Sequence, residues 1–566
     1  MSKRVASSLF VCLLFACSSE STSNGPDEGS GGTSAKGGTS AKGGASANQG
    51  GSMTGSGGTS SSNGASANAT GGSAASSGGN TNGGVSSGGA NNANGGSTNG
   101  GATNGGKAGG GANGGTTNRG GSSAGGNAAT SGGDGSSSGG TTSSNGGSGS
   151  GGAPIVSGAL YVSPTGADTN SGTIEQPLYS LSVAVSRVQA GGTIYVRGGT
   201  FKYKATIPLS ASGSASAPTR VLAYKDEKPI LDFSEQPYAA EQRGILLTGN
   251  YWQIQGLEIC YAGDNGIKIE GSHNRIERCV LHHNGDSGIQ LGFGHDDVNP
   301  NGELCSYNEV INCDSYLNFD FDGKGGDADG FACKMHNGKG NVFRGCRAWH
   351  NSDDGWDLYE TDWPVEIDNC WSWHNGDQTD FDAIYLQKMG VKMSSFSGNG
   401  NGIKLGGNGA GGSSKGTHVV RNSVAFNNNF RSKKGFDQNS HKGGVRVINS
   451  VAWGNGYNFM FEEDAESGSA NEFINNVSFA PGTSLGMEFS SGSVLRNNSW
   501  QLPVTADASD FVDLSETAAQ APRQADGSLP NNGFARLTAG SDLIDKGVDV
   551  QLPYNGSAPD LGAYER

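Results

Sequence analysis

The stretch Cys346-Arg-Ala-Trp-His-Asn351 returns 24 residues later as Cys370-Trp-Ser-Trp-His-Asn375. Related segments recur in both directions along the chain. When they are aligned on the position of Cys346, here called the anchor, successive anchors are 21 to 34 residues apart. Seven successive anchors are each followed, five residues later, by an asparagine. The anchors are Leu257, Cys279, Cys313, Cys346, Cys370, Ser394, Ser423, Ser450, Asn476 and Asn497. The asparagines are Asn284, Asn318, Asn351, Asn375, Asn399, Asn428 and Asn455. Such a period, with insertions, is typical of a solenoid of short strands, and the asparagines predict an inward ladder that binds turn backbone.

A short strand pattern follows most of these asparagines: a small residue, an apolar residue, any residue and a second apolar residue. Examples are Gly288-Ile-Gln-Leu, Gly355-Trp-Asp-Leu and Gly402-Ile-Lys-Leu. Period-two alternation turns the apolar side chains inward and the middle one outward. The predicted outward column is Lys268, Gln290, Ala332, Asp357, Tyr385, Lys404, Asp437 and Met460. We therefore expect an all-β, right-handed parallel β-helix with a short capping helix over 178–189 at its N-terminal end.

The residues before 154 differ in composition and predict two further segments. Lys3 and Arg4 followed by a short apolar run are typical of a signal peptide over 1–16. The run ends in Leu14-Phe15-Ala16-Cys17, which resembles a bacterial lipobox with Cys17 as the lipidated residue; an ordinary signal peptide is the alternative. Residues 17–153 are almost wholly Gly, Ser, Asn, Thr and Ala, which predicts a disordered tether. The segment 154–566 is the predicted β-helix domain.

The chain has 566 residues and a net charge of −15, and this balance excludes some partners. Nucleic-acid binding requires a basic face, so no nucleic-acid partner is expected. No run of about 18 apolar residues occurs, so we expect contact with a membrane only through a lipid anchor at Cys17. We expect an exported monomer that is lipid-anchored at the outer membrane or cell surface, or secreted.

Carboxylates gather before and within the outward strands of neighbouring coils. Asp329 and Asp354 occupy the position before the strand, Asp353 adjoins Asp354, and Asp357 points outward from the same strand. Like charges about 5 Å apart repel and raise one another's pKa unless a cation compensates them. Ca²⁺ suits such a group of oxygen ligands. The sequence therefore predicts a Ca²⁺ site at these four residues; a solvated acidic turn is the alternative.

Lys404 is predicted in the same outward column as Asp357, two coils further on and roughly 10 Å away along the axis. That gap suits one sugar ring between a cation and a base. An ammonium group near bound Ca²⁺ has a lowered pKa, so Lys404 is the predicted general base, and a solvated surface lysine is the alternative. The residues predicted to hold an anionic polymer are Tyr385, Arg431, Lys434 and Asp437.

Several of these segments resemble the family 9 polysaccharide lyases, which are pectate lyases with a parallel β-helix fold. The segments are Tyr161-Val-Ser-Pro, Asp329-Gly-Phe-Ala, Asn351-Ser-Asp-Asp-Gly-Trp-Asp-Leu358 and Gly402-Ile-Lys-Leu-Gly-Gly407. The resemblance extends from about Leu160 to Tyr564. It implies that the four aspartates are Ca²⁺ ligands and that Lys404 abstracts a proton. The implied activity is calcium-dependent β-elimination on an acidic polysaccharide, pectate or polygalacturonate.

Two other classes of protein stay open from the residues alone. A β-helix glycoside hydrolase would use two carboxylates to protonate the leaving group and activate water. A non-catalytic surface protein that binds polysaccharide would be served equally well by a lipid anchor and a long tether. An ultraviolet-absorbing unsaturated product distinguishes a lyase from a hydrolase, and turnover by the purified domain distinguishes an enzyme from a binding module.

Overall fold

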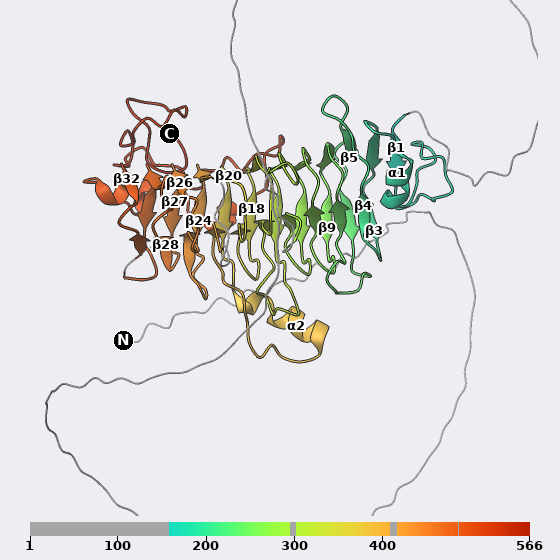
Figure 1. Cartoon of the computed structure of the whole chain (residues 1–566), viewed down its shortest axis with the longest axis horizontal. Coiled ribbons are helices and arrows are strands. Elements are labelled where there is room, and N and C mark those ends of the chain that lie inside the picture. Colours follow the sequence, from blue (N-terminus) through green and yellow to red (C-terminus); the bar gives the residue numbers. More distant parts are fainter. Residues whose placement is uncertain (1–157, 295–300, 408–415, 485) are drawn as a thin grey trace, which may run out of the picture. The chain divides into compact units, whose positions relative to one another are not determined.

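The computed structural model describes residues 158–294, 301–407, 416–484 and 486–566. The predicted signal peptide over 1–16, Cys17 and the predicted tether over 17–153 lie outside these residues. Successive coils stack along one axis and contribute strands to three parallel sheets (Figure 1). The predicted right-handed parallel β-helix is thereby confirmed.

Strands of the three sheets follow one another in turn along the chain. The first sheet contains β1 (Leu160–Val162), β2 (Thr193–Val196), β5 (Thr219–Ala223), β8 (Trp252–Gln255), β11 (Arg275–Glu277), β14 (Glu309–Ile311), β17 (Asn341–Arg344), β20 (Val365–Asp368), β23 (His418–Arg421), β26 (Val445–Ile448), β29 (Asn471–Ile474) and β32 (Val494–Arg496). The second contains β3 (Gly199–Lys202), β6 (Pro229–Asp232), β9 (Glu258–Cys260), β12 (Val280–His282), β15 (Asp314–Tyr316), β18 (Arg347–Trp349), β21 (Trp371–Trp373), β24 (Val424–Phe426), β27 (Val451–Trp453) and β30 (Val477–Phe479). The third contains β4 (Ile207–Leu209), β7 (Ile245–Leu247), β10 (Ile267–Ile269), β13 (Ile289–Leu291), β16 (Phe331–Cys333), β19 (Trp356–Asp357), β22 (Ile403–Lys404), β25 (Lys434–Asp437), β28 (Tyr457–Phe461) and β31 (Met487–Phe489).

Apolar residues that alternate along the strands fill the interior of the coils. In the third sheet the aligned inward residues are fully buried, namely Ile267, Ile289, Phe331, Trp356 and Ile403. Burying each such side chain contributes roughly 1.5–3 kcal/mol, so a one-residue slip of register is strongly disfavoured. The residues between them form the outward column, which is Lys268, Gln290, Ala332, Asp357, Lys404, Asp437 and Met460. The predicted column is confirmed except at Tyr385.

The segment between β21 and β22 forms no coil. It contains the 3₁₀ turn η1 (Gln378–Asp380) and the helix α2 (Asp382–Met389), where the pattern predicted an outward strand at Tyr385 and an anchor at Ser394. Phe381 and Tyr385, one helical turn apart, are buried in a small cluster with Phe319. The prediction was wrong because a four-residue apolar run does not distinguish strand from helix, and the i, i+4 spacing buries a helical face instead.

A ladder of buried asparagines runs through the turn between the second and third sheets. Its members are Asn284, Asn318, Asn351, Asn375, Asn428 and Asn455. From Asn318 onward, each side-chain oxygen accepts a hydrogen bond from the main-chain N–H of the member before it, at 3.0–3.4 Å. Asn399, which was predicted to belong, is missing from the ladder because its segment forms no coil. The last anchor is Asn498 instead of Asn497, since Asn498 accepts from Asn476 N.

Separate segments cover the N-terminal end of the solenoid and the outer face of its second sheet. Helix α1 (Leu181–Arg187) buries Leu181 and Ala184 against the first coils, which confirms the predicted capping helix in a shorter form (Figure 1). The C-terminal segment contains η2 (Ser499–Gln501), η3 (Ala508–Asp510) and α3 (Glu516–Ala519). This segment packs on the second sheet, where the rings of Phe534 and Trp371 lie 4.5 Å apart.

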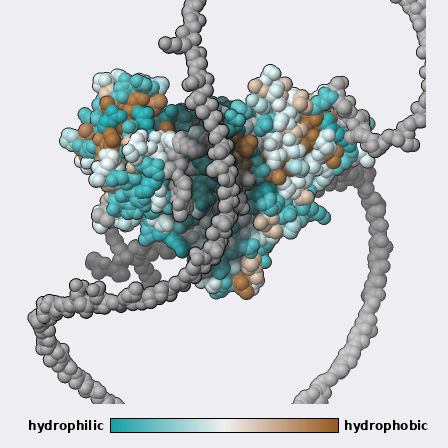
Figure 2. Space-filling view, viewed as in Figure 1, coloured by the Kyte–Doolittle hydropathy of each residue, from teal (hydrophilic) through white to brown (hydrophobic). Residues whose placement is uncertain are grey.

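Hydrophilic residues predominate on the face shown in Figure 2, and hydrophobic residues there form small separate patches. Within the described ranges, no helix combines the length and the apolar character needed to cross a membrane. The largest apolar side chains, among them Trp252, Trp356 and Phe331, are buried in the interior of the coils.

We expect Asn375→Ala to lower the free energy of unfolding by about 1–3 kcal/mol, because it leaves buried donors of Asn351 without their acceptor. Urea unfolding of the full chain, followed by circular dichroism, measures this loss. Asn399→Ala is the matched control, since Asn399 lies outside the ladder, and it should cost less than about 0.5 kcal/mol. Equal losses in the two variants would contradict the observed register.

Candidate active site

The predicted acidic residues meet where three neighbouring strands of the third sheet begin, β16, β19 and β22. Asp329 precedes β16 by two residues, and Asp353 and Asp354 stand in the turn before β19. Gly355 follows them because a Cβ at that position would collide with Ser372 Oγ of β21 and with the main-chain oxygen of Gly402 in the next coil. Close packing of the coils therefore requires a glycine directly after Asp354.

Asp329, Asp353 and Asp354 each present a carboxylate oxygen within 4.8 Å of the others. All three residues are buried, with at most 2% of their surface exposed. Main-chain N–H groups orient them: Asp354 N donates to Asp329 Oδ1 at 3.2 Å, and Asn401 N donates to Asp354 Oδ1 at 2.9 Å. The N–H of Asn399 donates to Asp353 Oδ1. The turns of adjacent coils thus aim three carboxylates at one another.

Two buried lysines lie against this acidic group. Lys404 Nζ is 3.0 Å from Asp354 Oδ2 and 3.2 Å from Asp357 Oδ1. Lys334 Nζ is 2.7 Å from Asp329 Oδ2 and 3.7 Å from Asp357 Oδ2. Asp357 therefore lies between two ammonium groups, beside the three converging carboxylates rather than among them.

The predicted gap of two coils between Asp357 and Lys404 was wrong. The two residues face each other on the paired strands β19 and β22, because the intervening residues form η1 and α2 instead of a coil. Lys404 is on the outer face of the sheet as predicted, but its residue surface is only 7% exposed. Its alternative interpretation as a solvated surface lysine is therefore wrong as well.

Burial and mutual repulsion dominate the electrostatics of the site. Burial raises the pKa of Asp329, Asp353 and Asp354, and neighbouring carboxylates raise it further. Burial by itself lowers the pKa of Lys404, but Asp354 and Asp357 outweigh it, so this pKa lies well above its usual value. The pKa of Lys334 is raised in the same way against burial. The carboxylates that contact the two lysines therefore favour the protonated form of both.

The donor set fits a hard divalent cation. Ca²⁺ prefers carboxylate oxygens and tolerates irregular geometry, and three such groups converge here with only partial compensation. Asp354 Oδ2 is buried and accepts no hydrogen bond of good geometry, although Lys404 Nζ faces it at 3.0 Å. A cation among Asp329, Asp353 and Asp354 would satisfy that oxygen and reduce the repulsion.

The residues predicted to hold a polymer lie in different places. Asp437 is the partner of Lys404 on the next strand, β25, and both of its oxygens lie 3.1 Å from Lys434 Nζ. Arg431 donates to a main-chain carbonyl of the α2 insertion. Tyr385 is on α2, only 6% exposed and packed in the small cluster, so it does not stand in the outward column.

Lys334 is the residue of this site that the sequence pattern missed. It follows the last residue of β16, and the strand pattern assigns no direction to a residue after the strand. Its only signal was a charged residue directly after the buried run Phe331-Ala-Cys. In the structure it is 4% exposed and also donates to the main-chain oxygen of Asp327 at 3.1 Å.

Comparison with known proteins agrees with this architecture. The family description "Pel9A-like, right handed beta helix region" matches residues 160–476. Pectate lyase L of Dickeya dadantii (strain 3937) is 39% identical over 420 residues, covering 72% of this chain and 90% of its own length. The crystal structure of pectate lyase Pel9A gives a TM-score of 0.63 at 38% identity, covering 72% of this chain and 96% of that chain. A solved rhamnogalacturonan lyase gives 0.52 at 26% identity, covering 68% and 97%.

Coil architecture and site together define a right-handed β-helix protein of the polysaccharide lyase class. Within that class the chain belongs to the Pel9A-like family, the family 9 pectate lyases that the sequence resemblance had indicated.

We expect Lys334→Met to lower the free energy of unfolding by about 3–5 kcal/mol in the presence of a chelator, because it leaves the fully buried Asp329 uncompensated. Asp329→Asn combined with Lys334→Met should cost less than the sum of the two single changes. Urea unfolding of the four proteins of this cycle measures the coupling. Additive losses would mean that the ion pair is not formed.

Proposed function

We propose that this protein is a calcium-dependent pectate lyase that cleaves polygalacturonate by β-elimination, with Lys404 as the base. Membership of the Pel9A-like family supports the class of reaction. The observation that carries the proposal is Lys404 on the outer face of the third sheet, in direct contact with the carboxylates of Asp354 and Asp357. A base and an acidic metal site side by side are what proton abstraction next to a carboxylate requires.

In the proposed reaction the free amine of Lys404 takes the proton from C5 of a galacturonate unit. The electron pair of that C–H bond forms the double bond between C4 and C5, and the C4–O bond breaks. The glycosidic oxygen leaves with its electron pair and takes up a proton from water. The products are a shorter chain and a chain whose new non-reducing end is a 4,5-unsaturated uronate.

Asp329, Asp353 and Asp354 are the proposed calcium ligands, with Asp357 beside them. Bound there, Ca²⁺ would supply positive charge that offsets the negative charge developing as the proton leaves C5. The chain's own part is to orient these carboxylates through main-chain N–H groups and to keep Lys404 within 3.2 Å of two of them. Lys404 must lose its proton before it can act, and Asp354 and Asp357, which raise its pKa, oppose that loss.

The test of the activity is absorbance of unsaturated uronate during incubation of the full chain with polygalacturonate, with calcium or with a chelator. Rhamnogalacturonan is the second substrate, because a rhamnogalacturonan lyase shares the fold at 26% identity. Reducing ends without absorbance would indicate a hydrolase, and binding without any product would indicate a binding module. Either result would overturn the proposal.

We expect Lys404→Ala to lower the rate of elimination by at least about 10²–10⁴-fold, the usual loss when a positioned proton acceptor is removed. Lys404→Arg should be a poor substitute, because guanidinium hardly loses a proton. The rate of the unaltered protein should rise toward alkaline pH, since only the deprotonated amine of Lys404 can take up the proton. The measurement is initial rate against pH at saturating calcium.

Lys392→Ala is the control for this series, because Lys392 is an exposed lysine on the α2 insertion. It should keep both the rate and the pH profile, and circular dichroism should show that all variants are folded. Near-normal turnover of Lys404→Ala would eliminate Lys404 as the base and direct attention to Lys334.

We expect Asp353→Ala to weaken calcium binding by at least about tenfold, because it removes one of three converging carboxylates. Isothermal titration with CaCl₂ measures this directly, and high calcium should restore part of the activity. Asp382→Ala on α2 is the matched control and should bind calcium normally. Unchanged affinity in Asp353→Ala, or full activity in excess chelator, would refute the metal site.

We also propose that the protein is exported and lipidated at Cys17, on the strength of the sequence Leu14-Phe15-Ala16-Cys17. Cys17→Ser should then move the protein from the membrane fraction to the soluble fraction of the cell. Unchanged fractionation would contradict the anchor.

A further inference from the structure

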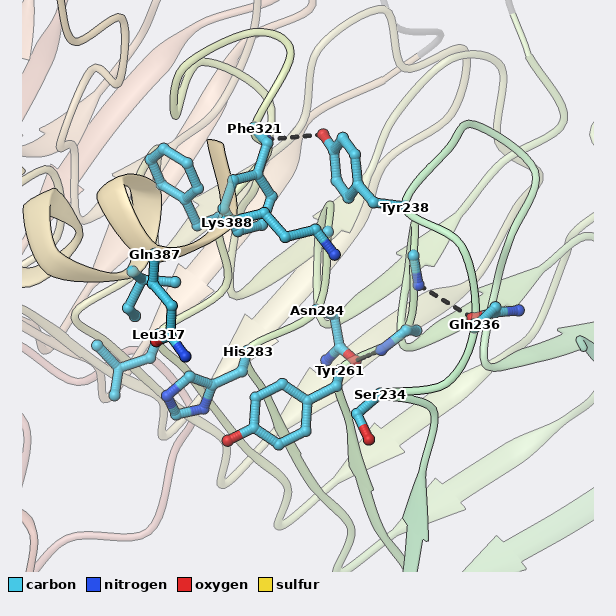
Figure 3. A pocket seen from close by; sticks show the side chains of 15 residues that line it. Ser234, Gln236, Tyr238, Tyr261, His283, Asn284, Leu317, Phe321, Gln387 and Lys388 are labelled. Carbon is cyan, nitrogen blue, oxygen red and sulfur yellow. Dashed lines mark hydrogen bonds between the residues drawn. The ribbon is translucent and has the colours of Figure 1, made fainter. Parts of the chain in front are cut away.

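A cavity of about 340 Å³ lies beside the α2 insertion, outside the acidic site (Figure 3). Its walls come from four parts of the chain: α2, the segment 317–321, the loop 234–238 after β6, and the turns that precede β10 and β13. Phe321 N donates to Tyr238 Oη at 2.7 Å, and the two rings meet edge to face at 4.9 Å. The wall is thus held together by a hydrogen bond and a ring contact across 83 residues of sequence.

Lys388 of α2 points its ammonium group into this space, between Tyr238 and Asn284 (Figure 3). Its Nζ lies 5.9 Å from the ring centroid of Tyr238 and 5.8 Å from that of Phe321. No carboxylate of the described residues forms an ion pair with it, in contrast to Lys334 and Lys404. A cation over two aromatic rings, without an acidic partner, suits a ligand that has both an apolar face and a negative charge.

The cavity lies beside the same sheet as the acidic site, on earlier coils. Gly263 and Gly285 line it, and each is followed by an aspartate, Asp264 and Asp286, that stands in its coil where Asp353 stands in its own. The strands after these turns, β10 and β13, continue the same sheet to β16, β19 and β22. Three to four strand spacings separate the turns before β13 and β10 from Lys404 on β22, on the order of 14–19 Å along the axis. A polymer that lies along the outer column therefore passes the cavity a few sugar units from the bond that is cleaved.

Lys388 also sets an orientation for a bound uronate. Asp264, on the side of the sheet, is 9% exposed, and its Oδ2 lies 3.4 Å from Arg243 Nε, so its charge is compensated there. The carboxylate of a uronate would therefore point outward to Lys388, while the faces of its sugar ring contact Tyr238 and Phe321.

We propose that this cavity is an accessory subsite for one uronic acid unit of the same polymer, with Lys388 binding the carboxylate. The proposal rests on the function proposed above, since it assumes that the polymer lies along the outward column of the third sheet. The subsite adds to the binding of long chains and takes no part in the chemical step, so it acts on KM and leaves kcat unchanged.

The experiment compares steady-state cleavage of hexagalacturonate and trigalacturonate by the full chain. Lys388→Ala should raise KM for the hexamer about three- to tenfold at low salt, with kcat retained, and leave both constants unchanged for the trimer, which is too short to span both sites. Lys388→Arg should restore most of the affinity, and Lys388→Glu should weaken it further. Lys392→Ala, a change of an exposed lysine four residues away, should have no effect.

A second measurement separates this inference from the proposed function. Titration of hexagalacturonate into Lys404→Ala, with and without Lys388→Ala, reports binding without turnover. Cleavage by the unaltered chain with no dependence on Lys388 would overturn the subsite and leave the lyase standing. Lys388-dependent binding of the hexamer without cleavage would overturn the lyase and leave the subsite. Equal effects on trimer and hexamer would also overturn it, because they would place Lys388 in the cleavage site.

Discussion

Parallel pairing between successive coils governs the core, the asparagine ladder and the acidic site of this protein. Each coil rises by one strand spacing, so a residue in one coil lies about 4.8 Å from its equivalent in the next. The asparagine ladder makes this possible, because it satisfies the turn N–H groups that would otherwise be buried without partners. Any side chain that recurs at one place in the coil then becomes a stack, whether the side chain is apolar, amide or acidic.

The acidic site is a product of this stacking, and it is also the place where stacking is electrostatically unfavourable. The coil repeat that stabilises Ile267, Ile289 and Phe331 as an apolar row also brings Asp329 and Asp354 together on adjacent coils. Buried carboxylates at that distance repel one another, and burial and repulsion together raise their pKa values. Lys334 and Lys404 offset part of it. Positive charge is therefore still lacking at the site, and a bound cation would supply it. Groups with strongly shifted pKa values commonly gather at functional sites in this way.

The α2 insertion decides the surroundings of the site. It leaves the coil between β21 and β22, so β19 pairs directly with β22 and Lys404 meets Asp357. Its own core of Phe319, Phe381 and Tyr385 fixes the helix from within. Lys388 then projects into a cavity one to three strands away from the acidic group. One insertion thus sets the distance between Lys404 and the carboxylates and forms a wall of the cavity.

Features that depend on short-range periodicity could be predicted from the residues alone. The period-two alternation predicted the outward positions of Asp357 and Lys404, the spacing of asparagines predicted most of the ladder, and the run Asn351-Ser-Asp-Asp pointed to the carboxylates. The strands that become neighbours across the α2 insertion could not be predicted, because strand pairing is non-local and a repeat pattern does not reveal a skipped coil. For the same reason Asn399 and Tyr385 were misplaced, and the partnership of Lys334 with Asp329 appeared only once the coils were stacked.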